Sequence, residues 1–485
     1  MIRTNIMGRF RSLNRLEKIL FAAIGAGFLL HMFWVPWPIT GWHSWRQADS
    51  AAVARNFYEG DMNPLMPRID WGGLGPGYVE TEAQIYTFFI AVIYKMVGVH
   101  EWIGRVLSLL FSMLTAYYLF LFGKVLGGRM YGLAAAAVFS ISPMETYFGT
   151  SIMPESLLLL SLIIAIYHYN SWTNDGKIID WMASLIFLSV AILIKPPSLY
   201  MGLPILWLSL NKYGWAFLRR IDIWLYVIIL FAVTGAYYYN AHRIYLNYGN
   251  TFGIWMPVTD KWLNPDLLLS WEFYNRLIFS RISERLLTYG GFAAFIVGLF
   301  LKARNIERVI NYWLIGVVIF LLVVARGNYV HDYYQLPVLL PASFVIARAF
   351  ERLVVGKRNF GRYALIFAFS IIPLLSVARN ITFARHAIDE LPNTKFAGKL
   401  DVMLPDDARV ITLYGGSPTL LYHMHRKGWS RWPDREEIEG IRTRADSSGV
   451  YVVGTKQNVE NISNRSGLDK GKLFLEEDNL ICIRI

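Results

Sequence analysis

The chain has 485 residues, of which 55% are hydrophobic and only 17% are charged, and its mean hydropathy is +0.36. A soluble domain usually carries about 25% charged residues, so this composition excludes an ordinary soluble protein. The net charge of +12 does not by itself indicate nucleic-acid binding, because membrane proteins gather Lys and Arg in the loops on one side of the bilayer. The single cysteine, Cys482, excludes an intrachain disulfide.

The apolar residues come in blocks of about 18–20, the length that crosses a hydrocarbon core of ~30 Å. We therefore predict an all-α polytopic membrane protein with about eleven transmembrane helices. The predicted spans are 19–37, 103–122, 130–148, 155–171, 180–194, 198–210, 221–238, 286–301, 309–325, 335–350 and 363–378.

The apolar segment 84–97 is too short for an ordinary span, and we expect it to lie on the membrane or dip into it. All the basic turns between spans then fall on the same side as the basic N-terminus, as the positive-inside rule requires. This topology places the N-terminus in the cytoplasm and the C-terminus outside it. The long loops, above all the first loop at 38–102, then lie on the outer face.

Two domains are expected, a membrane domain over 1–378 and a small extracytoplasmic α/β domain over 379–485. The second domain changes composition, and short runs of β-forming residues bounded by turn residues predict strands. These runs are "ARVITLYGG", "GVYVVG", "KLFLEE" and "ICIRI". The segment "SPTLLYHMH" predicts a short helix that follows a Ser N-cap.

The first loop carries the earliest candidate residues. Asp49 follows the first span within "WRQADSAAVARNFYEGD", and the stretch after it predicts an amphipathic helix along the membrane surface. A charge so close to the bilayer is often functional, although Asp49 could equally be a helix N-cap. Arg46 would help to hold a lipid phosphate or the loop. Glu80 and Glu82 could bind a metal, orient an acceptor or flank a helix start.

Later loops add a carboxylate and several cations. Pro154 and Glu155 suit the start of a helix, and Glu155 is expected on the same side as Asp49. Lys195 and Arg326 lie outside against the positive-inside trend, which favours an anionic partner, although a snorkelling side chain is the commoner explanation for such a lysine. The loop "ARGNYVHDYYQLP" adds further donors suited to a phosphate. They are His331, Tyr333 and Tyr334.

Four of these stretches together resemble the GT-C superfamily of membrane glycosyltransferases. More narrowly, they resemble the bacterial relatives of protein O-mannosyltransferases and of the lipid A aminoarabinose transferase. The stretches are the Asp49 segment, "VETEAQIYTFFIAVIYKMV", "TYFGTSIMPESLLLL" and "HDYYQLP". The chain departs from both branches, because Ser50 stands where they tend to have Glu. The sequence Thr81-Glu82-Ala83 also replaces the Lys-Pro of the aminoarabinose group.

The resemblance implies a GT-C fold and inverting sugar transfer on the outer face of the bacterial cytoplasmic membrane. The donor would be a polyprenyl-phosphate sugar such as an undecaprenyl-phosphate sugar, and the acceptor a lipid, glycan or protein. Asp49 would be the catalytic base. Glu80, Glu82 and Glu155 would orient the acceptor or bind a divalent cation, the one cofactor suited to them. The lipid phosphate would be bound by Arg46, Lys195, Arg326, His331, Tyr333 and Tyr334.

Three other functions share this layout. A transporter or flippase of a lipid-linked sugar would need charges near mid-bilayer and usually internal repeats, and the sequence shows few of the first and none of the second. A polymerase or ligase of envelope polysaccharide would use the same face and the same lipid phosphate. A non-catalytic scaffold would use 379–485 as its docking module.

Overall fold

The computed structural model describes residues 14–254, 262–355, 359–434, 437, 449–466 and 472–484. The chain divides into two compact units, each assembled from segments far apart in the sequence. Unit 1 comprises Met1–Pro36, Arg105–Ala236 and Met256–Ile381, and unit 2 comprises Trp37–Gly104, Tyr237–Trp255 and Thr382–Ile485. The first loop thus groups with the C-terminal segment. The predicted domains 1–378 and 379–485 stay a prediction.

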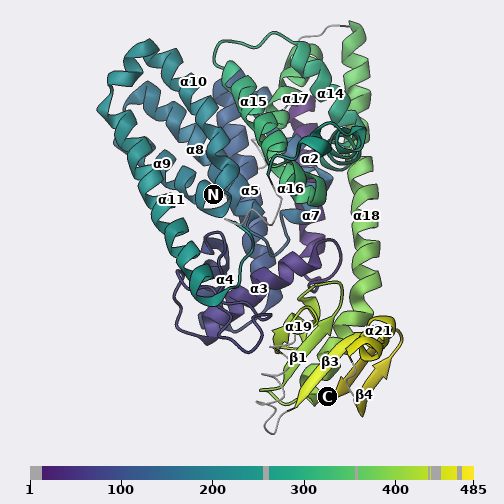
Figure 1. Ribbon diagram of the computed structural model, residues 1–485. Helices are drawn as coiled ribbons and strands as arrows, with labels where there is room; N and C mark the ends of the chain where they lie inside the picture. The colour runs from purple at the N-terminus through teal and green to yellow at the C-terminus, as the bar shows by residue number, and fades with distance from the viewer. Residues whose placement is uncertain are drawn as a thin grey trace, which may run out of the picture. The chain divides into compact units, whose positions relative to one another are not determined.

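Unit 1 is built from helices (Figure 1). Its main helices are α2 (Arg15–Trp34), α5 (Glu101–Gly127), α6 (Arg129–Ser140), α7 (Pro143–Phe148), α8 (Glu155–Asp175), α9 (Ile178–Ile194), α10 (Gly202–Tyr213), α11 (Ile221–Tyr248), α14 (Thr288–Phe300), α15 (Arg308–Val323), α16 (Ala325–Val330), α17 (Leu336–Ala349) and α18 (Asn359–Met403). Shorter helical segments are η1 (Pro196–Met201), η2 (Gly214–Arg219), α12 (Pro265–Leu268), α13 (Trp271–Tyr274), η4 (Asn275–Leu286), η5 (Asp332–Gln335) and η6 (Phe350–Val355). The bounds of α5, α11 and α18 extend into the segments of unit 2.

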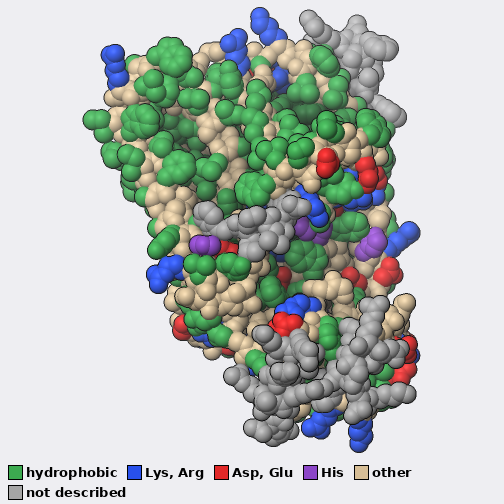
Figure 2. Space-filling view, in the orientation of Figure 1, with side chains coloured by type: hydrophobic (Ala, Val, Ile, Leu, Met, Phe, Trp, Pro, Cys, Tyr) green, Lys and Arg blue, Asp and Glu red, His purple; other side chains and the backbone are tan. Residues whose placement is uncertain are grey.

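The surface of unit 1 is apolar where a soluble protein would be polar. Hydrophobic side chains crowd the visible surface over α9, α10 and α15 (Figure 2). Ile186 of α9 and Ile315 of α15, for example, are 54% and 50% exposed. Apolar patches of this extent indicate contact with lipid or with another protein.

Length and composition identify fewer membrane-crossing helices than the sequence predicts. Within the described residues, α2, α5 and α11 are long and apolar enough to cross a membrane. A fourth span results if the segment Trp271–Leu286 is counted together with α14, which is bent from it by 110°. The predicted spans overlap helices of the structure, but the number of eleven is not confirmed.

Small residues bring helices of unit 1 close together. A Cβ atom placed on Gly27 of α2 would lie 2.1 Å from the backbone oxygen of Ser140 at the end of α6. Gly25, two residues earlier on α2, has no atom within 4 Å of such a Cβ. Membrane helices often approach one another through small residues of this kind. The α2–α6 contact therefore depends on Gly27 and not on Gly25.

Substitution of Gly27 by leucine should destabilise unit 1, because the added side chain forces α2 away from α6. Overpacking of this kind costs about 1–3 kcal/mol. The measurement is the thermal unfolding temperature in detergent micelles. Gly25→Leu is the control and should unfold at the wild-type temperature. Equal unfolding temperatures for the two variants would contradict the α2–α6 packing.

Unit 2 contains a five-stranded sheet in the order β2-β1-β3-β5-β4. The central strand β3 (Val450–Thr455) pairs in parallel with β1 (Arg409–Leu413), which pairs in parallel with β2 (Lys427–Trp429). On the other side β5 (Leu480–Arg484) runs antiparallel to β3 and to β4 (Lys472–Glu477). The four strands predicted from the sequence are thereby confirmed. The short β2 was missed, because "KGW" lacks the pattern of a strand.

Helices cover both faces of this sheet. One core contains Phe396 of α18 and Leu421 of α19 (Thr419–His423) against Val410 of β1. The other core contains Val459 of α21 (Lys456–Ser466) and Trp429 of β2. The predicted helix in "SPTLLYHMH" is confirmed as α19, although its N-cap is Pro418 and not the serine before it.

The first loop contributes α3 (Ser44–Glu59) and α4 (Ile85–Val97) to unit 2. The helix expected after Asp49 exists, but its buried residues run without a break from Arg46 to Phe57. An amphipathic surface helix would keep its polar face exposed, so the expected amphipathic character is wrong for α3. Its position along the membrane surface stays a prediction. The helix packs instead against α4 and α19, and these contacts bury its polar side chains.

Candidate functional site

Asp49 is buried in the second turn of α3, with 4% of its surface exposed. The N-cap of α3 is His43, so the alternative reading of Asp49 as an N-cap is wrong. The indole Nε1 of Trp71 donates a hydrogen bond of 2.9 Å to Oδ1 of Asp49. The carboxylate is thus held inside unit 2 by a donor from the first loop.

Burial raises the pKa of Asp49 from 3.8 to about 7. The positive charge of Arg46 and the hydrogen bond from Trp71 lower this pKa, whereas the negative charges of Asp70 and Glu82 raise it. Loss of hydration dominates, because the charged form of a buried carboxyl is disfavoured in a medium of low dielectric. A carboxyl with a pKa near neutrality can both accept and release a proton under physiological conditions, as a general base must.

Arg46 lies one turn before Asp49 on α3 and is engaged by other groups of unit 2. Its guanidinium forms an ion pair with Glu82 and lies over the ring of Phe252, 5.2 Å from the ring centroid. The hydroxyl of Thr81 also donates to Glu82, at 2.8 Å. The structure therefore brings together Arg46 and Glu82, to which the sequence assigned different roles.

Glu80 is fully buried, and its described contacts differ from those of Glu82. It accepts a hydrogen bond from the hydroxyl of Thr251, and Nδ1 of His242 lies 3.5 Å from its Oε1. Among the described residues, no three His, Cys, Asp or Glu side chains are grouped so that they could hold a metal ion. Glu82 is paired with Arg46 in this structure, and a metal site at Glu80 and Glu82 stays a prediction.

Unit 1 contains a second polar cluster, centred on Lys195. Its Nζ lies 2.9 Å from Oε1 of Glu155 and also lies over the rings of Tyr334 and Tyr333, at 4.3 and 5.0 Å from their centroids. His331 stacks on Tyr333 with the ring centroids 5.3 Å apart. The structure thus joins five of the predicted residues around one amine. The amine, the imidazole and the two phenol groups are hydrogen-bond donors suited to an anion.

Two further predictions in unit 1 concern the start of α8 and the position of Arg326. Glu155 is the first residue of α8 and follows Pro154, so the predicted helix start is confirmed. Its Oε2 is buried and has no hydrogen-bond partner among the described residues. Arg326 lies on α16, and its side chain is exposed.

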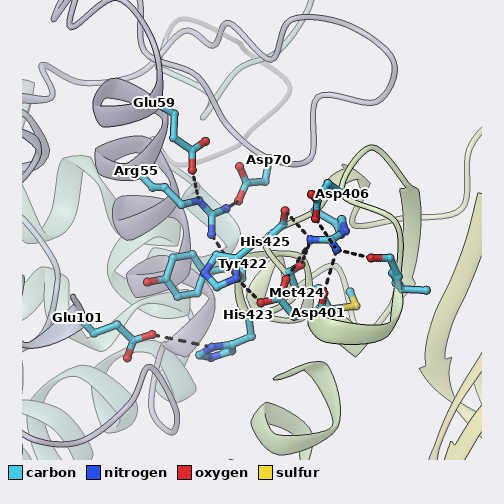
Figure 3. Close-up of polar contacts among 12 residues, drawn as sticks. Arg55, Glu59, Asp70, Glu101, Asp401, Asp406, Tyr422, His423, Met424 and His425 are labelled. Atoms are coloured by element: carbon cyan, nitrogen blue, oxygen red, sulfur yellow. Dashed lines mark hydrogen bonds and ion pairs between the residues drawn. The ribbon is translucent and has the colours of Figure 1, made fainter. Parts of the chain in front are cut away.

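Sequence reasoning missed a buried ion pair close to Asp49. Arg55 of α3 donates to Oδ2 of Asp70 at 2.5 Å and to the backbone oxygen of Tyr422 at 3.0 Å (Figure 3). Its guanidinium also lies over the ring of Tyr422. Arg55 and Tyr422 are 367 positions apart, and a single sequence carries no signal for such a pair. Trp71, in "RIDWGG", likewise belongs to no motif.

The comparisons with known proteins concern the fold of the chain. The profile of the dolichyl-phosphate-mannose-protein mannosyltransferase family matches residues 82–239. The structure is similar to ArnT from Cupriavidus metallidurans, crystallised with undecaprenyl phosphate. The TM-score is 0.68 at 11% identity, over 96% of this chain and 97% of that chain. This is a GT-C fold. The resemblance inferred from the sequence is confirmed at this level.

Two further GT-C structures are similar over most of the chain. One is the oligosaccharyltransferase of Archaeoglobus fulgidus, with a TM-score of 0.50 and 13% identity, over 90% of this chain and 68% of that chain. The other is the mycobacterial arabinofuranosyltransferase AftD, with a TM-score of 0.52 and 14% identity, over 97% of this chain and 40% of that chain. No curated protein matches the chain in sequence.

The two buried aspartates of unit 2, Asp49 and Asp70, should respond differently to replacement by asparagine. Asp70→Asn removes the charge that compensates the buried guanidinium of Arg55, and loss of one partner of a buried pair costs about 3–5 kcal/mol. Asp49→Asn replaces a group whose pKa of about 7 leaves it partly protonated at neutral pH. We expect Asp70→Asn to lower the thermal unfolding temperature at pH 7. Asp49→Asn should leave that temperature nearly unchanged. The reverse order would contradict both assignments.

Proposed function

We propose that the protein is an inverting glycosyltransferase of the bacterial cytoplasmic membrane. It would move a sugar from a polyprenyl-phosphate-linked donor to a lipid, glycan or protein acceptor on the outer face. The observation that carries the proposal is the buried Asp49, with its pKa near neutrality, on a chain of GT-C fold. The undecaprenyl phosphate in the ArnT structure supports the class of donor.

Asp49 is the proposed catalytic base. Its carboxylate takes the proton of the acceptor hydroxyl while that oxygen attacks the anomeric carbon of the donor sugar. The bond from the anomeric carbon to the phosphate oxygen breaks, and its electron pair leaves with the polyprenyl phosphate. Attack opposite the leaving group inverts the anomeric configuration.

Lys195 is the cation proposed for the lipid phosphate. A fixed cation that meets developing negative charge in a site of low dielectric lowers the barrier. Glu155 and the two tyrosine rings hold the amine in place. A ligand phosphate would compete with Glu155 for the same amine. His331 and Tyr333 are the further donors proposed for this phosphate, and Arg326 is an additional cation.

The proposed topology has the N-terminus in the cytoplasm and the C-terminus in the periplasm. It is supported by the Lys and Arg residues in the turns on the N-terminal side. Figure 2 shows Lys and Arg side chains along the upper rim, beyond the hydrophobic surface over α10 and α15. Sugar transfer would then occur on the face that bears the first loop.

Asp49→Asn should reduce sugar transfer by about 10²–10⁴-fold, the usual contribution of a general base. The measurement is transfer of radiolabelled sugar from a panel of polyprenyl-phosphate sugars to an envelope extract, by purified protein in lipid nanodiscs. Wild-type activity should rise with pH through about 7, because Asp49 acts only when it is deprotonated. Full activity of the variant would refute the proposal. A parallel reaction with EDTA tests the need for a divalent cation.

Lys195→Met should weaken binding of the donor, because the phosphate loses a charge-assisted contact. Such a contact is worth about 1.5–3 kcal/mol, which corresponds to a KM for the donor roughly 10- to 100-fold higher. The exposed Lys212 provides a matched control, and Lys212→Met should leave the KM unchanged. An unchanged KM in Lys195→Met would remove this lysine from the phosphate site.

Movement of labelled lipid across the bilayer without any transfer product would favour a flippase.

A further inference from the structure

We infer that Trp71 is the positioning residue of Asp49, and that the C-terminal part of unit 2 holds Trp71 in place through a backbone clasp on strand β2. The inference rests on the proposed role of Asp49 as the base. It assigns the C-terminal segment a part in positioning the proposed base.

The clasp consists of two backbone hydrogen bonds that flank Trp71. The amide of Gly428 on β2 donates to the oxygen of Asp70 at 2.9 Å, and the amide of Gly73 donates to the oxygen of Gly428 at 2.8 Å. Strand β2 is one of the two edge strands of the sheet, and an edge strand has backbone groups available to bind an added segment. The first-loop segment 70–73 is therefore attached to this edge strand by two backbone hydrogen bonds.

Gly73 fits this clasp because it has no side chain. Its φ of +66° belongs to the left-handed region, which side chains disfavour. A Cβ atom at this position would lie 2.9 Å from Nε1 of Trp429 on β2. Gly75, two residues later, has only an ordinary contact at 3.4 Å and no positive φ. The close approach of the loop to β2 is thus specific to Gly73.

A second anchor ties α3 itself to the C-terminal segment. Arg55 joins Asp70 of the clasped segment to the backbone of Tyr422 at α19, as Figure 3 shows. Asn56 also donates to Oδ1 of Asp70, at 3.0 Å. Asp49, which accepts the hydrogen bond from Trp71, belongs to the same helix as Arg55. The C-terminal segment therefore holds both the acceptor Asp49 and the donor Trp71.

The ring of Trp71 is packed on two sides, so its N–H has a fixed direction. It lies against the core that contains Val410 and Leu421, and it meets Phe252 edge-on with the ring centroids 5.8 Å apart. Phe252 is also the ring beneath Arg46. A small shift of the clasped segment would therefore move the indole relative to Oδ1 of Asp49.

The hydrogen bond from Trp71 favours the charged form of Asp49 and lowers its pKa. The other charged groups that act on this carboxyl are Arg46, which lowers the pKa, and Asp70 and Glu82, which raise it. Without the indole donor, one of the two effects that counteract burial is lost, so the pKa of Asp49 rises. The base is then protonated over a wider range, and the acidic limb of the activity profile moves to higher pH.

The test is the pH profile of sugar transfer by Trp71→Phe, which keeps an aromatic ring and loses the N–H. A hydrogen bond to a charged group corresponds to a shift of about one pH unit or more. We expect the acidic limb to move up by that amount, with activity recovering to within a few-fold of wild type above it. Trp432→Phe, in the other core of the sheet, is the control and should keep the wild-type profile. A wild-type profile for Trp71→Phe would overturn the inference.

Gly73→Ala tests the clasp without changing Trp71, and Gly75→Ala is its control. We expect Gly73→Ala to shift the acidic limb in the same direction as Trp71→Phe, and Gly75→Ala to leave it in place. Thermal unfolding of all variants shows whether they fold. An unshifted profile for a folded Gly73→Ala would remove β2 from the positioning of Asp49. Inactivity of Asp49→Asn together with a wild-type profile for Trp71→Phe would refute this inference alone, whereas an active Asp49→Asn would refute the proposed function.

Discussion

The burial of one carboxylate, that of Asp49, is the constraint on which the arrangement of unit 2 depends. A carboxylate removed from water is costly unless donors replace its hydration. Arg46 supplies a nearby positive charge, and Trp71 supplies a directed N–H. Each of these partners needs support in turn, Arg46 from Glu82 and Phe252, and Trp71 from the sheet. One buried charge therefore links α3, the first loop and the C-terminal strands.

The same physical demand recurs at Lys195 in unit 1. A partly buried amine also needs compensation, and Glu155 provides a counter-charge while the rings of Tyr333 and Tyr334 provide their π-faces. A buried ion pair adds little net stability over a well-packed apolar alternative. The Lys195–Glu155 pair is therefore better explained as part of a binding site than as a source of stability. The proposed exchange of Glu155 for a lipid phosphate uses this property.

Unit 2 shows why a low-identity GT-C fold can still specify its own site. The chain shares 11% of its residues with ArnT over nearly the full length of both chains, so the fold tolerates broad exchange of side chains. Function resides in particular groups that the fold presents. Here those groups include the clasp on β2 and the Arg55–Asp70 pair, which hold the first loop to the C-terminal segment. The C-terminal segment therefore helps to hold the first loop, which carries Asp49, in its folded position.

The sequence by itself determined the local structure. Apolar blocks predicted the helices of unit 1, short β-rich runs predicted β1, β3, β4 and β5, and Pro154-Glu155 predicted the start of α8. Each of these signals is contained in a few neighbouring residues. Only the tertiary structure decided that α3 is buried on every side, that Arg46 pairs with Glu82, and that Trp71 donates to Asp49. These contacts join residues far apart along the chain, and they form only after the helices and the sheet edge have packed together.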